Sequence, residues 1–405
     1  MNKKISAAVT SAALVLGSTA ANAGIIIPAG EWTLDVNGNV NVYATYYDYD
    51  DTTAVTGGLA GTQNDTESQS QSINTGLLPA WLGFTGTTRQ NDLDVSFTIS
   101  MQPNVSDNSD VAGDENHPKW RQAFLTFGDK SWGTVKMGKD LGIFAGNAIL
   151  NDMTLLGVGA SAGSVGGATS GAKTSLGGIG TGYIYPAWKG QISYTTPNMN
   201  GFTATVGITN PNQHPDASVT TAYQDRYGFE GQVQYTFDAG KVWVSGASYE
   251  YRDGNEAGAG SWDATAMDIG AALNFGNAGI VAYYYDTKGV GTTMFGGLLG
   301  GAPGGADAGV DSSGNERDGD GGYIQGTYVI PTGTKLGVAY GVSKLDPATA
   351  ADTAVVVENN RWTVGAYHPL TKHLNLVAEY NAVEAENQTT KNQADSISLG
   401  AILFF

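Results

Sequence analysis

Side chains that could support catalysis or hold a metal occur at three places in this sequence. Residues 159–163 have the Gly-x-Ser-x-Gly spacing of a nucleophilic serine, but that motif needs a strand before it and His and acidic partners. His368 and His373 flank a turn with no third ligand nearby, which makes a poor zinc site. Residues 311–321 are acidic but lack the residue order of an EF-hand. The sequence therefore predicts no enzyme and no cofactor or resident metal.

Most of the other polar side chains alternate with apolar ones, and a period of two predicts β-strands. Apolar residues and asparagines occupy opposite faces of residues 34–46. The last strand ends with the chain and turns one apolar face outward, through Ile397, Leu399, Ala401, Leu403 and Phe405. A strand of this kind needs a partner strand and an apolar solvent, and a closed barrel in a membrane provides both.

Candidate strands recur along the whole chain. They begin near residues 32, 72, 91, 119, 132, 182, 201, 225, 240, 262, 278, 320, 333, 359, 373 and 395. Their connections alternate between short turns rich in Gly, Asn and Pro and long segments, which is typical of outer-membrane barrels. The sequence thus predicts an all-β fold, a 16-stranded antiparallel transmembrane β-barrel, as a single domain over residues 24–405.

The first 23 residues have the features of a cleaved secretory signal. Lys3 and Lys4 precede an apolar stretch, and residues 21–23 read Ala-Asn-Ala. The apolar stretch is shorter than the roughly 20 residues that a spanning helix needs. The chain has no cysteine, so disulfides cannot stabilise it outside the cytoplasm.

The chain is acidic, with a formal net charge of −18. This balance argues against a nucleic-acid partner, because phosphate binding needs a basic surface. Acids at the mouth of a pore would favour cations, so we expect a cation preference. Alternation also turns two basic residues, Lys136 and Lys189, toward a polar interior, because their neighbours Val135, Met137 and Ile192 face outward.

Several segments, in order and spacing, resemble the general porins of Gram-negative bacteria. These are residues 80–86 (Ala-Trp-Leu-Gly-Phe-Thr-Gly), residues 121–142, residues 194–202 and the C-terminal Phe405. The resemblance implies a water-filled homotrimer in the outer membrane, surrounded by lipid and lipopolysaccharide. It implies a long constriction loop after strand 5, at 141–181, that folds inward. It also implies that Phe405 is the signal read by the barrel-assembly machinery.

The resemblance also assigns residues to the pore constriction. Asp152 falls where the family has an eyelet carboxylate, and Arg121 matches an arginine of the barrel wall. Leu156, Trp81 and Asn39 occupy positions where the family carries an acid, an arginine and a lysine. These departures weaken the expected transverse field and bring apolar groups near the narrowest point.

The function expected from these observations is passive diffusion of small hydrophilic solutes and ions. A substrate-specific channel for a sugar or a hydrophobic solute is the alternative, suggested by Trp81 and the aliphatic residues Leu155 and Leu156. An outer-membrane barrel enzyme ranks lower, because no catalytic pair stands out at one rim.

Overall fold

The computed structural model describes residues 24–63, 67–103, 105, 119–160, 174–210, 226–252, 261–295, 304–353 and 355–405. The expected signal segment, residues 1–23, lies outside the described residues. The strands within them are β1 (Ile25–Ala29), β2 (Trp32–Tyr49), β3 (Gln69–Asn74), β4 (Trp81–Gln90), β5 (Leu93–Gln102), β6 (Lys119–Asp129), β7 (Gly133–Leu141), β8 (Trp188–Thr195), β9 (Phe202–Thr209), β10 (Gly228–Phe237), β11 (Gly240–Arg252), β12 (Ser261–Phe275), β13 (Ala278–Lys288), β14 (Asp318–Val329), β15 (Lys335–Leu345), β16 (Val356–Pro369), β17 (Leu374–Asn387) and β18 (Lys391–Phe404).

These strands occupy sixteen positions around one closed antiparallel sheet. On one side of β2, β18 pairs with residues 39–49 and β1 pairs with residues 32–36, so β1 continues the line of β18. On the other side, β3 pairs with residues 43–48 and β4 with residues 33–39. β3 and β4 are therefore two halves of one interrupted barrel strand.

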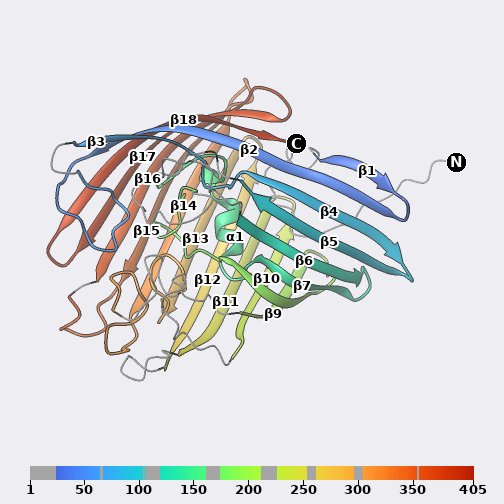
Figure 1. Ribbon diagram of the computed structural model, residues 1–405, viewed down its shortest axis with the longest axis horizontal. Helices are drawn as coiled ribbons and strands as arrows, with labels where there is room; N and C mark the ends of the chain where they lie inside the picture. The colour runs from blue at the N-terminus through green and yellow to red at the C-terminus, as the bar shows by residue number, and fades with distance from the viewer. Residues whose placement is uncertain are drawn as a thin grey trace, which may run out of the picture.

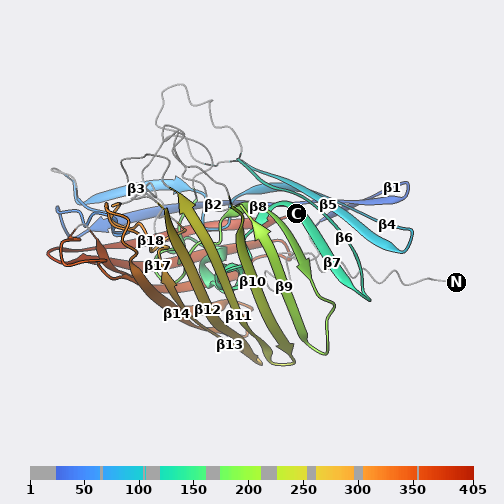
Figure 2. The same ribbon diagram turned by 90° about the horizontal axis from the view of Figure 1, so that it is seen from below.

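Pairing of β2 with β18 closes the barrel. Figure 1 shows the blue β2 lying along the red β18, although the two strands come from opposite ends of the chain. In Figure 2 the yellow-green strands β9–β12 cross the near side, and the red β17 and β18 lie behind them. The predicted sixteen-stranded antiparallel barrel is confirmed, although β8 begins at Trp188 rather than near residue 182.

The barrel is apolar outside and polar inside. Large apolar side chains of the strands remain exposed on its outer face, for example Val233 at 53%, Met267 at 65% and Ile397 at 52%. The alternate positions carry enclosed polar groups, such as Asn41 and Ser398. A protein that folds in water buries its apolar face, so this inverted pattern belongs to a barrel surrounded by lipid.

The connections differ in length at the two rims. Two residues suffice between β10 and β11 and between β12 and β13, where Gly276 adopts a φ of +62°. The long connections, such as those between β7 and β8 and between β13 and β14, join strand ends at the opposite rim. Phe405 ends the chain by exchanging backbone hydrogen bonds with Gly38 of β2.

Within the described part of the chain, no helix is long and apolar enough to cross a membrane.

Candidate functional site

The described parts of the segment between β7 and β8, residues 142–160 and 174–187, lie inside the barrel. It carries the short helix α1 (Gly146–Asn151) and a 3-10 turn at Met153–Leu156. The Tyr323 hydroxyl of β14 donates to the Ala148 carbonyl at 2.8 Å, and the Tyr43 hydroxyl of β2 donates to the Leu156 carbonyl at 2.7 Å. Because these partners come from distant strands, the segment spans the lumen between them.

Carboxylates of the wall hold the backbone of this segment. Glu230 of β10 accepts from the Phe144 amide at 3.0 Å, and Asp268 of β12 accepts from the Ala145 amide at 3.2 Å. Glu379 of β17 accepts from the amides of Val158 and Gly159 at 2.8 and 2.9 Å. Charged acceptors make strong hydrogen bonds to backbone donors in an enclosed site. These three inward-facing acids are therefore occupied by the segment and do not face open water.

A second inward element interrupts the wall between β3 and β4. The Asn41 side chain donates to the Leu78 carbonyl at 2.9 Å and accepts from the Gly76 amide at 2.8 Å. The neighbouring Asn39 donates to the Pro79 carbonyl at 3.0 Å. These contacts replace the strand ladder and leave residues 75–80 buried within the lumen.

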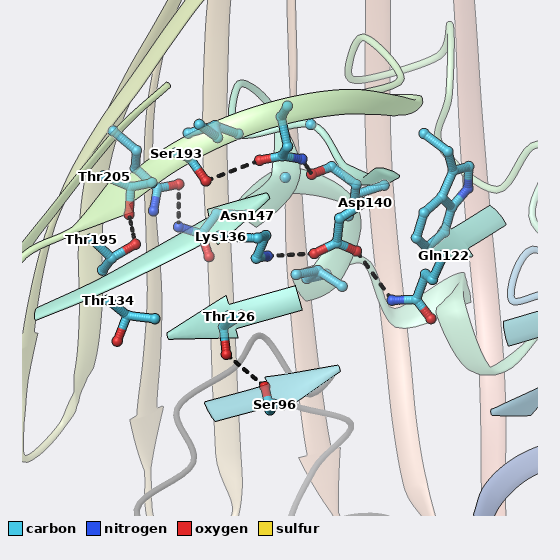
Figure 3. A pocket seen from close by; sticks show the side chains of 18 of the residues that line it. Ser96, Gln122, Thr126, Thr134, Lys136, Asp140, Asn147, Ser193, Thr195 and Thr205 are labelled. Atoms are coloured by element: carbon cyan, nitrogen blue, oxygen red, sulfur yellow. Dashed lines mark hydrogen bonds and ion pairs between the residues drawn. The ribbon is translucent and has the colours of Figure 1, made fainter. Parts of the chain in front are cut away.

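The remaining hollow is a cavity of about 1620 Å³ beside β4–β11. Strand residues of its polar wall include Ser96, Gln122, Thr126, Thr134, Lys136, Asp140, Ser193, Thr195 and Thr205, and Asn147 reaches it from α1. Figure 3 shows Ser96 and Thr126 joined across β5 and β6, and Asp140 lying between Lys136 and Gln122. The cavity therefore lies on one side of the lumen, because the inward segment fills the other side.

Arg121 reaches this cavity through a β-bulge. Gln122, Phe124 and Thr126 follow the inward face of β6, so strict alternation would turn Arg121 outward. The pairing of β5 with β6 shifts between Ser100 and Met101 and leaves Arg121 unpaired in the ladder. A bulge redirects a side chain in this way, and Arg121 lines the cavity.

Comparison with known proteins gives a family for this architecture. A sequence profile of Gram-negative porins matches residues 8–388. The chain belongs to the Gram-negative porin family. It is an integral outer-membrane protein that forms a channel. The search of curated proteins finds no match.

Solved structures share the fold of this porin at low sequence identity. The outer-membrane channel DcaP of Acinetobacter baumannii superposes with a TM-score of 0.68 and 15% identity, over 95% of this chain and all of the other. The anion-selective porin of Comamonas acidovorans gives 0.63 and 16%, over 93% and 100%. OmpT of Vibrio cholerae, in its trimer form, gives 0.56 and 14%, over 92% and 99%. At such identities the likeness establishes the fold.

The residues predicted for the constriction lie in two places in the structure, on the barrel wall and on the inward segment. Arg121, Lys136 and Trp81 line the cavity. Lys189 has the predicted inward direction but is only 5% exposed, because its ammonium pairs with Glu230 at 2.8 Å. Asn39 is 1% exposed and holds the break in the wall described above.

The other two predicted residues lie on the inward segment. Leu156 is partly buried against the apolar core of the lumen. Asp152 is 4% exposed, and its carboxylate accepts from the Thr154 amide at 2.9 Å and from the Tyr183 hydroxyl at 2.8 Å. Arg361 of β16 lies 3.8 Å from the same carboxylate. Their role at the narrowest point stays a prediction.

The lumen of the porin differs in charge from the whole chain. Of the residues that the structure describes, six cations and four acids line the cavity, namely Arg89, Lys119, Arg121, Lys130, Lys136 and Lys241 against Glu31, Asp94, Asp129 and Asp140. Both Asp94 and Asp129 pair with Arg89, and Asp140 pairs with Lys136. Among the described residues, no carboxylate forms an ion pair with Arg121 or Lys241. The described lining of this cavity is therefore net positive in an acidic chain.

Two features of this site were not predicted from the sequence. Gln102 accepts from the Arg121 amide and so supports the bulge. The break at 75–80 carries a local signal, Pro79, because proline cannot donate to a strand ladder. That proline could have indicated the break, whereas nothing local indicates which asparagines hold it.

Proposed function

We propose that this channel carries small solutes by passive diffusion along the eccentric cavity, and that residues 142–160 and 174–187 set its bore. The anchoring of this segment to β2, β10, β12, β14 and β17 supports the second point. A segment held from so many sides narrows the lumen without closing it, since a cavity of about 1620 Å³ remains beside it.

We infer an anion preference at the narrow part of the channel. The single observation that carries it is Arg121, a cation turned into the cavity with no carboxylate partner among the described residues. The cation preference expected from net charge rests on acids at the pore mouth. Of the acids of the described wall, Asp94 and Asp129 pair with Arg89, and Glu230 and Glu379 accept from backbone amides. Charge beside the permeating ion acts more strongly than distant surface charge, because salt screens the latter within about 8–10 Å.

Reversal potentials in a potassium chloride gradient across a planar bilayer test this inference. The wild-type channel should favour chloride, and Arg121→Gln should lower the chloride-to-potassium permeability ratio by about two- to fivefold, as loss of one poorly screened charge predicts. Lys372→Gln, in the turn after β16 and away from the cavity, is the matched control and should leave the ratio unchanged. A wild-type channel that favours potassium would overturn the proposal.

The proposal also covers how the channel is assembled in the outer membrane. The porin acts as a homotrimer without catalytic activity, in contact with outer-membrane lipid and lipopolysaccharide, after loss of residues 1–23. The trimer form named for OmpT of Vibrio cholerae supports the oligomeric state. Phe405 is the residue that the assembly machinery reads, and its position as the last residue beside Gly38 is compatible with that role.

A further inference from the structure

Apolar side chains face the water-filled cavity at one level of the lumen. Trp81, Leu150, Tyr185 and Trp188 all line the cavity and are only partly buried. Partly exposed aromatic and aliphatic groups in a wet channel cost free energy unless a ligand covers them. Such a patch inside a channel therefore suggests a binding surface.

Strand register brings two of these aromatics level with Arg121. Leu82, next to Trp81, pairs with Met101, and Met101 pairs with Trp120, next to Arg121. Neighbouring strands lie about 4.8 Å apart, so Trp81 on β4 and Arg121 on β6 are separated by roughly 10 Å along the wall.

The same register continues on the other side of Arg121. Gln122 bonds to Asp140 at 3.1 Å, and the adjoining pair on β7 and β8 is Leu141 with Trp188. Trp188 on β8 thus lies two strands beyond Arg121, again roughly 10 Å away. An arginine is therefore flanked by a tryptophan on each side in one belt of the wall.

The inward segment contributes the third side of this belt. Tyr185 lines the same cavity as Arg121 and is partly buried. The Tyr185 backbone amide is fixed by the Thr293 carbonyl at 2.8 Å. Wall and segment thus present one guanidinium and three aromatic rings toward the same space.

We propose that this belt, formed by Trp81, Arg121, Tyr185 and Trp188, is a binding subsite for aromatic carboxylates. The proposal rests on the anion-preferring channel inferred above and adds a ligand class to it. A guanidinium binds a carboxylate through two parallel hydrogen bonds. A ring attached to that carboxylate stacks on or meets edgewise a neighbouring indole. Benzoate joins both features in one small molecule.

Benzoate is the probe for a test on the purified full-length channel in planar bilayers. Benzoate should halve the chloride current at a concentration about tenfold lower than acetate does, since acetate forms the ionic contact without the aromatic one. Benzyl alcohol, which has the ring without the charge, should not block at the same concentration. Arg121→Gln and Trp188→Ala should each raise the half-blocking concentration of benzoate by about five- to tenfold, as loss of one such contact predicts.

Matched controls separate this subsite from general effects. Trp132→Ala removes an exposed tryptophan from the turn after β6, outside the cavity, and should leave block by benzoate unchanged. Leu150→Ser alters the apolar rim of the segment and should weaken block even if Trp188→Ala fails to fold. Equal block by benzoate and acetate in a chloride-preferring channel would overturn the subsite and leave the proposed function intact. A potassium-preferring wild-type channel would refute the proposed function itself.

Discussion

The side-chain oxygen of Gln102 accepts a hydrogen bond of 3.1 Å from the backbone amide of Arg121. Gln102 is 1% exposed, and its amide nitrogen also donates to the Ser100 hydroxyl at 2.8 Å. Since the register of β5 and β6 shifts at this point, the glutamine satisfies the amide that the bulge removes from the ladder. The neutral Gln102 side chain thus supports the bulge that turns the Arg121 guanidinium toward the cavity.

Substitution of Gln102 by leucine should lower the anion preference without removing any charge. The Arg121 amide would lose its acceptor, at a cost of about 1 kcal/mol or more, and the bulge would relax toward regular pairing. The chloride-to-potassium permeability ratio should fall toward that of Arg121→Gln. Ser100→Ala, which removes the second bond of the glutamine and keeps the acceptor, should change the ratio little. An unaltered ratio in Gln102→Leu would contradict the role of the bulge.

Substitution of Asn41 by alanine should widen the channel. This side chain bonds to both Gly76 and Leu78 and thereby holds the inward break of the wall. Its loss leaves buried backbone groups without partners, which costs about 1–3 kcal/mol. We expect a larger and noisier single-channel conductance.

Thr45→Ala is the matched control for this experiment. It lies on the same face of β2 and loses only its bond to Ser398 at 2.9 Å. Its conductance should equal that of the wild type. If Asn41→Ala conducts like the wild type as well, the break does not limit the bore.

Substitution of Asp152 by asparagine should destabilise the inward segment. The Asp152 carboxylate accepts from Thr154, from Tyr183 and from the Gly178 amide at 3.0 Å. In the variant, the side-chain amide nitrogen of the new asparagine would face these hydrogen-bond donors, which should lower the stability of the segment by about 1–3 kcal/mol. Thermal unfolding should begin at a lower temperature, and open-channel noise should rise. A change in ion selectivity alone, at unaltered stability, would instead show that this carboxylate acts as a charge of the lumen.

Acid should release a contact between two outer connections. Arg317 is 1% exposed and binds Asp352 through its Nε at 2.8 Å and its Nη2 at 2.7 Å. Hydrogen bonds from this guanidinium hold the pKa of Asp352 below its ordinary value of 3.8. A carboxyl whose pKa is lowered on folding stabilises the fold above its unfolded pKa, and this contribution disappears as pH falls through the lower, folded value.

Hydrogen exchange measures this dependence. Amides of residues 304–317 and 346–353 should exchange equally, after correction for intrinsic rates, from pH 8 to pH 5. Their protection should fall only below pH 3.8, the ordinary pKa of the group. In Asp352→Asn the protection should already be low at pH 7. Loss of protection between pH 5 and pH 7 in the wild type would point to another titrating group.

Local alternation predicted the barrel well, because each strand of a membrane barrel must separate lipid from the lumen. Lys136 illustrates this, since its neighbours Val135 and Met137 already assign its direction. Alternation fails at Arg121, where a bulge changes the phase, and it cannot find the interruption of the wall at 75–80. The bulge at Arg121 depends on Gln102 of the neighbouring strand β5. The interruption at 75–80 depends on Asn39 and Asn41 of β2.

The constriction loop implied by the family resemblance stays a prediction, and family position did not indicate which groups of the inward segment remain wetted. The burial of Asp152 depends on Tyr183, later in the same segment, and on Arg361, some 200 residues away. Net charge also does not indicate which acids are occupied, since Glu230 and Glu379 bind backbone amides of the segment. Such long-range partners leave no periodic signal in the sequence.

Single-channel recording of the purified protein in planar bilayers tests the central claim most directly. A barrel with lipid outside, water inside and a cationic wall should give discrete, ohmic current steps whose reversal potential in a potassium chloride gradient has the sign of chloride permeation. Folded protein that inserts into the bilayer yet gives no steps, or gives steps that reverse with the sign of potassium permeation, would contradict the account.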